Sequence, residues 1–303
     1  MHITLIHNPG AGSGDRPDRA RLEALLQAAG HEVFYQSADA EDWDAALKRP
    51  AELVVVAGGD GTVGRVARRL AGAGVPFAAL PTGTANNISR SLGLMDHSIE
   101  EHIALWPRAR RLQLDLGIAR GPWGEEAFIE GIGLGLFAWM MPLADQSPAL
   151  AAITDADEAL SYALKMLRRL LEEHQPDRIR ATLDGTDISG DYLLFEALNL
   201  PYVGPNLFLA PDAKPDDGLL NVVMVDEAHR NELLECITHW HEGKSTPPRL
   251  PTARGKRLLV EPVADNVHID DKLWRPGDNE RPARGDIEVR LQGGAVEVLV
   301  PPL

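Results

Sequence analysis

The segment 53-LVVVAGGDGTV-63 decides the fold of this chain. Its first five residues are apolar and mostly β-branched, which predicts a strand buried on both faces. Val63, Val66 and Leu70 follow at helical spacing, so the glycines of 58–62 stand between a strand and a helix. Glycine lets backbone N–H groups approach an anion closely, and the start of a helix adds partial positive charge. The segment therefore predicts a phosphate-binding loop. Asp-Gly also favours a hairpin turn, but a hairpin needs a return strand with alternating apolar and polar residues. The residues that follow this loop have helical spacing instead.

Two more loops hold the same place in the pattern. Residues 8–14 follow a predicted strand at 3–7, and residues 81–87 follow a predicted strand at 77–80. In a parallel sheet with right-handed crossovers, such loops all emerge at the carboxyl ends of the strands. We therefore expect the three loops to line one edge of a sheet. Taken singly, 8–14 is as well explained by a surface turn and 81–87 by a helix cap.

The order of the predicted elements indicates an α/β fold with two domains. Strands and helices alternate in the first half, as in a Rossmann-like parallel sheet. From about residue 128 the chain reads as short strands between Gly, Pro and Asp turns, which is typical of a β-sandwich, with two helices at 158–173 and 231–241. We expect a nucleotide-binding domain at 1–127 and a β-sandwich domain for substrate and metal at 128–303. The strands expected in the second half are 179–183, 192–199, 219–225, 258–261, 287–291 and 296–300.

The composition argues against several classes of protein. The 303 residues carry a formal net charge of −15, which argues against nucleic acid as a partner and against strong electrostatic attachment to an anionic membrane. The single cysteine, Cys236, excludes an internal disulfide and a multi-cysteine metal site. No stretch reaches the roughly 18 apolar residues of a membrane span, and no cleavable signal follows Met1. We expect a cytoplasmic protein whose membrane contact is transient and apolar.

The glycine loops occur together with a fourth segment, 211-PDAKPDDGL-219, and this ordered set resembles the diacylglycerol kinase catalytic-domain family. The resemblance rests on Asn8-Pro9 with the glycines after it and on residues 58–62, 81–87 and 211–219. The family includes bacterial soluble lipid kinases and the sphingosine and ceramide kinases, and it is distantly related to NAD kinases and 6-phosphofructokinases. The resemblance implies an enzyme that uses ATP and Mg²⁺ to phosphorylate the hydroxyl group of a lipid such as diacylglycerol, in phospholipid biosynthesis.

The resemblance also implies which residues bind the nucleotide and a metal. It places a structural Mg²⁺ at the backbone oxygens of Lys214 and Leu219 and at the carboxylate of Asp217, and hard oxygen ligands suit that ion. A simple Asp-Gly turn is the alternative for this segment. The nucleotide contacts implied are Asn8, Ser37, Gly58, Gly59, Asp60, Gly61, Thr62, Val63, Gly64, Thr84 and Asn87.

Two carboxylates are the candidates for catalysis. Asp270 aligns with the proton acceptor in the family's Asp-Gly-Glu segment, although the next two residues here are Asp271 and Lys272. A lysine this close would weaken Asp270 as a base or would contact a phosphate directly. Asp60 is expected to bind Mg²⁺ or a magnesium-bound water, and relatives leave room for it to share the role of base.

Several alternatives stay open from the sequence alone. A small-molecule kinase of the NAD kinase type, or a catalytically idle nucleotide- or lipid-binding module, would carry the same loops. The apolar stretch 134–141 could line a cleft for acyl chains or form plain core, and the glycines of 131–135 carry no weight as a nucleotide loop. Asn87 and Asn221 stand where relatives often have Asp. We expect a lipid with a free hydroxyl as the partner and no nucleic acid, and a homodimer is left open.

Overall fold

The chain divides into two compact units. The computed structural model describes residues 1–12, 16–241, 249–263, 266–275 and 285–302. Unit 1 comprises Met1–Asp115 together with Gly293–Leu303, and unit 2 comprises Leu116–Gln292. The boundary expected at residue 127 falls inside a strand of unit 2, and the C-terminal segment belongs with unit 1.

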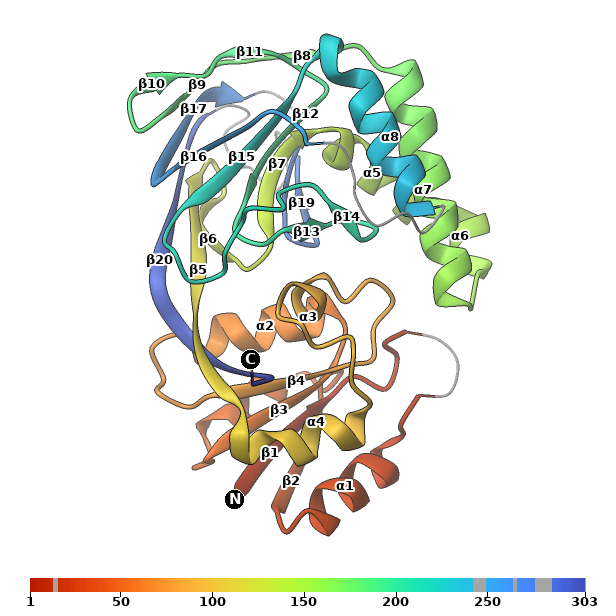
Figure 1. The fold of residues 1–303 in the computed structure, drawn as a ribbon, viewed down its shortest axis with the longest axis vertical. Coiled ribbons are helices and arrows are strands. Elements are labelled where there is room, and N and C mark those ends of the chain that lie inside the picture. The colour runs from red at the N-terminus through yellow and green to blue at the C-terminus, as the bar shows by residue number, and fades with distance from the viewer. Residues whose placement is uncertain (13–15, 242–248, 264–265, 276–284, 303) are drawn as a thin grey trace. The chain divides into compact units, whose positions relative to one another are not determined.

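Unit 1 is built on a parallel sheet in the order β2-β1-β3-β4 (Figure 1). The strands are β1 (His2–His7), β2 (Glu32–Ser37), β3 (Leu53–Gly58) and β4 (Phe77–Pro81). Every residue of β3 is buried, because β1 and β4 pair with its two edges and apolar side chains cover it. The predicted parallel α/β sheet is confirmed.

Helices follow the strands of unit 1 as the loops predict. They are α1 (Arg19–Ala28), α2 (Asp60–Leu70), α3 (Asn87–Ser91) and α4 (Ile99–Leu105), with short 3-10 helices at Trp43–Lys48 and Trp106–Arg108. Helix α2 begins directly after Gly59, because the chain is extended at Gly59 and turns helical at Asp60. The second glycine loop is therefore the first turn of a helix.

Unit 2 contains a sheet in the order β16-β15-β12-β7-β18-β19, paired antiparallel throughout the described residues. Its strands are β7 (Gly131–Gly135), β12 (Leu194–Leu198), β15 (Leu220–Val225), β16 (Thr252–Gly255), β18 (Val267–Ile269) and β19 (Lys272–Trp274). Side chains alternate across this sheet, so Phe195 faces one core while Leu194 faces another.

A second group of strands covers one face of that sheet. Strand β17 lies between β9 and the first half of β20, and all of these pairs are antiparallel. Phe195, Leu258 and Ile287 share one apolar cluster, which fills the space between the two layers. The predicted β-sandwich is confirmed. The strands of this group are β5 (Arg110–Gly121), β6 (Gly124–Phe128), β9 (Ala181–Leu183), β10 (Thr186–Asp187), β17 (Arg257–Val263) and β20 (Gly285–Val300); short pairs are β8 (Asp177–Ile179) with β11 (Gly190–Tyr192) and β13 (Tyr202–Val203) with β14 (Leu207–Phe208).

Helices cover the other face of the six-stranded sheet of unit 2. The two predicted helices are present as α7 (Ala156–Glu173) and α8 (Arg230–His241), and they pack side by side (Figure 1). The apolar stretch 134–141 forms most of a further helix, α5 (Leu136–Asp145), and a short α6 (Pro148–Ala152) follows it. Phe137 and Met140 of α5 lie in the core with the buried Cys236, so most of that stretch is core.

Burial raises the pKa of the Cys236 thiol to about 12, which agrees with a structural and unreactive cysteine. Among the described residues, the helices are all too short or too polar to span a bilayer.

Two strands belong to both units. β5 leaves unit 1 at Asp115 and continues into unit 2, and β20 returns in the opposite sense to complete the sheet of unit 1. The sequence predicts two separate strands at 287–291 and 296–300, whereas the structure has one continuous strand that passes through Gly293 and Gly294. Its first half pairs with β17, and Val298 pairs in parallel with Phe77 of β4.

Candidate active site

The three glycine loops of unit 1 meet, as predicted, at the carboxyl edge of the parallel sheet. A Cβ placed on Gly83 would lie 2.3 Å from the Cα of Gly59, and one on Gly12 would lie 2.0 Å from the carbonyl oxygen of Thr82. Backbone thus contacts backbone, and glycine is required because any side chain would separate the loops. Gly12 also has φ +70°, which favours glycine. Gly14 of the first loop lies outside the described residues.

Polar side chains tie these loops together. Asn8 donates from Nδ2 to Oγ1 of Thr62 at 3.1 Å, and its Oδ1 accepts from the N–H of Gly10 at 2.9 Å. Asp60 accepts from the N–H of Ile88 at 2.9 Å through Oδ1, which joins the start of α2 to the start of α3. The loops are therefore a preorganised set, since each is fixed by its neighbours.

The remaining predicted nucleotide residues lie on or beside these loops. Thr84 is exposed in the third loop, and Asn87 is the buried first residue of α3. Asn86 has φ +55° and exchanges two hydrogen bonds with Gly83, from Gly83 N–H to its Oδ1 at 2.9 Å and from its Nδ2 to Gly83 O at 2.8 Å. Asn86 therefore shapes the loop that presents Thr84. The junction of β3 and α2 contains four more of the predicted residues, Gly58, Gly61, Val63 and Gly64.

Ser37 lies at the end of β2, next to the end of β1. The two strands remain in register to their last pair, His7 with Ser37, and the N–H of Ala38 donates to the carbonyl of His7 at 2.7 Å. Burial lowers the pKa of His7, which favours its neutral form. Arg65 of α2 donates to the carbonyl of Ala38 at 2.7 Å, so it brings a guanidinium beside this strand end. The sequence interpretation overlooked Arg65, which is one turn after Gly61 and is exposed.

Asp270 of unit 2 is held by a row of backbone donors. It is the first residue of the tight turn between β18 and β19, where Ile269 pairs with Lys272. Its carboxylate accepts from the N–H groups of Ile129 (3.2 and 3.0 Å), Glu130 (2.9 Å) and Gly131 (3.2 Å). Hydrogen bonds of this kind stabilise a carboxylate as an anion and fix its direction.

The two residues that depart from the family's Asp-Gly-Glu segment have a structural account. In this turn Asp270 has φ +49°, while Asp271 is not in the left-handed region, so residue 271 does not require glycine. Lys272 points its ammonium group to Glu126, with Nζ 3.1 Å from Oε2. The concern that Lys272 weakens Asp270 therefore loses force, because Lys272 is engaged elsewhere.

The predicted metal segment folds as a turn closed by an ion pair. Asp217 accepts from the N–H of Leu219 at 3.0 Å through Oδ1, and its Oδ2 is bonded to Arg254 of β16. The carbonyl oxygen of Leu219 accepts from Nδ2 of Asn221 at 3.3 Å, and the side chain of Lys214 is exposed. With Arg254 in place, this set of oxygens does not fit Mg²⁺, since the one carboxylate is already neutralised. The predicted ion would have to displace Arg254.

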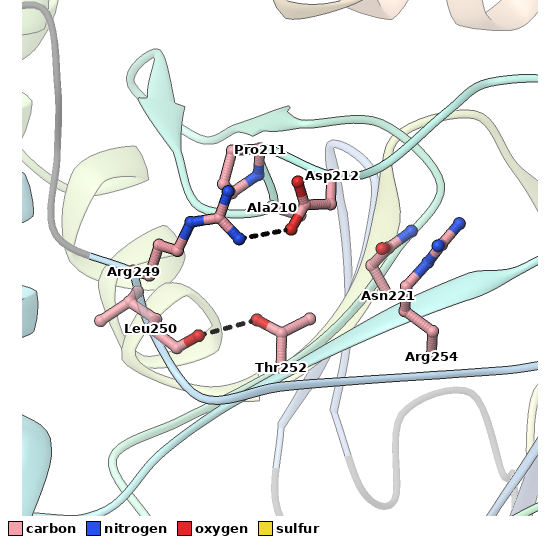
Figure 2. Close-up of a pocket in the computed structure, with 8 residues that line it drawn as sticks. All are labelled: Ala210, Pro211, Asp212, Asn221, Arg249, Leu250, Thr252 and Arg254. Atoms are coloured by element: carbon pink, nitrogen blue, oxygen red, sulfur yellow. Dashed lines mark hydrogen bonds and ion pairs between the residues drawn. The ribbon is translucent and has the colours of Figure 1, made fainter.

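A pocket of about 160 Å³ lies beside this segment, and Figure 2 shows the residues that line it. Arg249 closes one side through an ion pair with Asp212 at 2.9 Å, and Arg254 lines the other. Asn221 is fully buried, and its Oδ1 has no hydrogen-bond partner among the residues that the structure describes. The pocket is thus lined by two arginines, each already paired with an aspartate, and by polar groups of Thr252 and Asn221, which suits a polar group.

Comparison with known proteins gives two domain matches. Residues 2–119 match the diacylglycerol kinase catalytic domain, and residues 145–300 match the YegS C-terminal NAD kinase beta sandwich-like domain. The chain belongs to the family that joins a diacylglycerol kinase catalytic domain to a YegS C-terminal domain. The matches to kinases make the chain a kinase, which is the class of enzyme that the family resemblance implies.

Curated relatives agree with this assignment along most of the chain. A diacylglycerol kinase of Mycobacterium tuberculosis is 27% identical over 282 residues, which cover 90% of this chain and 89% of the relative. A diacylglycerol kinase of Bacillus subtilis is 26% identical over 242 residues, which cover 77% of each chain. A probable lipid kinase of the YegS-like type from Stenotrophomonas maltophilia is 28% identical over 204 residues, which cover 64% of this chain and 63% of the relative.

Solved structures show the same fold at lower identity. A diacylglycerol kinase from Bacillus anthracis has a TM-score of 0.69 at 21% identity, with 99% of this chain and 97% of the other covered. Yeast NADH kinase in complex with NADH has a TM-score of 0.52 at 10% identity, with 99% and 83% covered. Both solved structures therefore share the fold of this chain.

Proposed function

We propose that this kinase transfers the γ-phosphoryl group of ATP to the hydroxyl group of a lipid of the diacylglycerol type. The observation that carries the proposal is the close packing of the three glycine loops, Gly59 against Gly83 and Gly12 against Thr82. Loops of this kind at a helix start suit the phosphates of a nucleotide. The names of the curated relatives from Mycobacterium tuberculosis and Bacillus subtilis support diacylglycerol as the acceptor class.

Unit 1 holds the nucleotide in this proposal. The N–H groups of 58–64 cradle the phosphates, while Asn8, Ser37, Thr84 and Asn87 complete the contacts. Asp60, whose Oδ1 accepts from the N–H of Ile88, would hold the Mg²⁺ ion that accompanies ATP, directly or through a water, and that ion would neutralise charge on the phosphates. Phosphoryl transfer needs positioning and neutralisation of charge more than covalent chemistry, and the loops supply both.

Unit 2 supplies Asp270 as the proton acceptor. The acceptor oxygen forms a bond to the γ-phosphorus, the bond from that phosphorus to the β–γ bridging oxygen breaks, and the hydroxyl proton passes to the carboxylate of Asp270. The N–H groups of 129–131 fix the orientation of this carboxylate, and a general base must be held in position. Nothing in this step is assigned to Lys272, whose ammonium group is paired with Glu126.

The test is transfer of radiolabelled phosphate from γ-labelled ATP with MgCl₂, offered with diacylglycerol in mixed micelles, with NAD, or with neither. We expect label in the organic phase only when diacylglycerol is present. Asp270→Asn should lower kcat by roughly a hundredfold or more while ATP binding persists. Label in NADP would contradict a lipid as the acceptor. Transfer by Asp270→Asn at the wild-type rate would contradict Asp270 as the base.

A further inference from the structure

Strand β7 has one face without side chains. Gly131, Gly133 and Gly135 alternate with Ile132 and Leu134, whose side chains lie in the core between the two sheets. The glycines therefore face the opposite side of the sheet, the side covered by helices. The sequence pattern shows these glycines but suggests no role for them in nucleotide binding.

Gly133 lies in register between two ionisable residues on the neighbouring strands. Glu196 of β12 pairs with Gly133 on one side, and His268 of β18 pairs with it on the other. A Cβ on Gly133 would lie 2.0 Å from Oε1 of Glu196, so only glycine leaves room for that carboxylate. Across the bare strand, Nε2 of His268 lies 2.9 Å from Oε1 and 2.8 Å from Oε2 of Glu196.

This pair is buried and reaches the turn that carries Asp270. Glu196 is 0% and His268 2% exposed, with Phe137 of α5 against the imidazole ring. The other ring nitrogen, Nδ1, lies 3.3 Å from the carbonyl oxygen of Asp270. Because a carbonyl oxygen only accepts hydrogen bonds, this contact requires a proton on Nδ1.

One shared proton satisfies the whole set. If the proton between Nε2 and Glu196 stays on the histidine, both ring nitrogens donate. If it moves to Glu196, Nδ1 still donates to Asp270. Burial alone would lower the pKa of His268, but the negative charge and hydrogen bond of Glu196 raise it overall, and burial raises the pKa of Glu196. Only when the pair loses this proton does the Nδ1 lone pair face the carbonyl oxygen.

We propose that Glu196 and His268 are positioning residues that share one proton so that Nδ1–H of His268 fixes the Asp270 turn. The turn needs such a restraint because Asp270 has φ +49°, a conformation that costs free energy for a residue other than glycine. Its N–H donates to the carbonyl of Gly131, its carboxylate is held by 129–131, and His268 secures its carbonyl. The consequence for catalysis rests on the proposed role of Asp270 as the base.

The direct test is two-bond ¹H–¹⁵N NMR of wild-type protein labelled with ¹⁵N-histidine, with the His268 signal identified by its loss in His268→Asn. We expect Nδ1 of His268 to carry a proton at pH 7. A bare Nδ1 at pH 7 would overturn the proposal. This readout does not depend on phosphoryl transfer, so it separates the failure of this inference from the failure of the proposed function.

A pair of variants tests the effect on catalysis. In His268→Asn the side-chain amide takes the place of Nδ1 and can donate to Asp270, whereas in His268→Gln it takes the place of Nε2 and reaches Glu196 only. We expect kcat of His268→Gln to be at least about tenfold below that of His268→Asn, with KM for ATP the same in both.

His102→Gln is the matched control, because His102 is also buried and also bonded to a carbonyl, that of Leu94 at 2.8 Å, but lies in unit 1. It should keep the wild-type kcat. Equal kcat values for His268→Asn and His268→Gln, with both variants folded by thermal melting, would overturn the positioning role. If either variant fails to fold, the NMR experiment on the wild type decides.

Discussion

Asn8 donates from its side-chain amide to the hydroxyl oxygen of Thr62 across 3.1 Å, which joins the first glycine loop to the first turn of α2. The same side chain accepts from the N–H of Gly10, so it holds its own loop as well. Asn8→Ala removes both hydrogen bonds, and we expect KM for ATP to rise by up to about thirtyfold because two bonds of roughly 1 kcal/mol each are lost. Steady-state kinetics at varied ATP concentration measures this.

Thr62→Ser and Thr62→Val are the matched controls for Asn8. Serine keeps the accepting oxygen and should leave KM for ATP within about twofold of wild type, whereas valine should reproduce part of the loss. An unchanged KM in Asn8→Ala would show that the loops hold their places without this contact.

The contact between Gly59 and Gly83 predicts a severe effect for a single methyl group. In Gly83→Ala the new Cβ would lie 2.3 Å from the Cα of Gly59, and neither backbone can yield as a flexible side chain would. We expect ATP affinity to fall by roughly two orders of magnitude, measured by calorimetric titration, because small misplacements of a positioned site are costly.

Gly30→Ala is the control for Gly83→Ala. Gly30 has φ +80°, and a Cβ added there would meet no atom within 4 Å, so the substitution strains the backbone but displaces no loop. We expect a loss of stability of about 1 kcal/mol and normal ATP affinity. Equal ATP affinity in the two variants would contradict the account of the glycine contact.

Lys272 gives a prediction of a small effect. Its ammonium group is 3.1 Å from Glu126 and exposed, and exposed ion pairs contribute little. We expect Lys272→Met to change kcat by less than about threefold and stability by less than about 1 kcal/mol. The pH dependence of kcat should also stay the same. A tenfold rise in kcat, or a shifted pH profile, would show that Lys272 acts on Asp270 after all.

Arg254 gives a prediction about metal dependence. Because Arg254 already neutralises Asp217, we expect EDTA or added Mg²⁺ to leave the melting temperature of the wild type unchanged. In Arg254→Gln the carboxylate loses its counter-charge, so added Mg²⁺ should raise the melting temperature by a few degrees, about the effect of 1 kcal/mol in a domain of this size. The double variant Asp217→Asn, Arg254→Gln is the control, and added Mg²⁺ should leave its melting temperature unchanged. A large loss of stability of the wild type in EDTA would support the metal site implied by the family instead.

The buried pair predicts how stability depends on pH. Its pKa values are raised, so the native protein keeps one proton above about pH 6.5, where the unfolded chain has lost it. The free energy of unfolding contributed by His268 should therefore be fully present below about pH 6.5 and fall as the pH rises above it, by up to about 1.4 kcal/mol per pH unit, and the raised pKa of Glu196 acts in the same sense. Urea unfolding between pH 6 and 9 measures this.

Glu196→Gln removes the charge that raises the pKa of His268, so the loss of stability above pH 6.5 should be smaller in this variant. His7 and His102 have pKa values lowered by burial, and they act in the opposite sense, because their protonation destabilises the native state as the pH falls. Both histidines are present in the wild type and in Glu196→Gln, so their contributions cancel when the pH dependence of the two proteins is compared. Identical slopes for wild type and Glu196→Gln would contradict the prediction.

Much of unit 1 follows from local sequence. The run 53–57 predicts a buried strand. Glycine loops between strands and helices lie together where parallel strands end. What the sequence does not give is the contact of Gly59 with Gly83, since a sheet edge brings loops near but does not set distances. The strand at 110–121 was overlooked, although Leu112, Leu114, Leu116 and Ile118 alternate in the pattern of a half-buried strand.

Unit 2 was harder to predict because its site depends on residues far apart in the chain. The role of Gly133 follows only from Glu196 and His268, which antiparallel pairing brings to either side of it. A signal was present in Glu196, a charged residue within the apolar strand 194–198, since a buried charge needs a partner. The identity of that partner depends on register, which the sequence does not specify.

The path of β20 has a consequence for how the protein is made. Residues 293–300 leave the ribosome only after all of unit 2, yet Val298 pairs with Phe77 and the N–H of Gly72 donates to the carbonyl of Ala295. A nascent chain that has emerged as far as β19 therefore has every loop for the nucleotide but an unfinished sheet beside β4. Maturation of unit 1 waits on a strand translated after unit 2, so a chain stalled before residue 293 should remain open to proteases within unit 1.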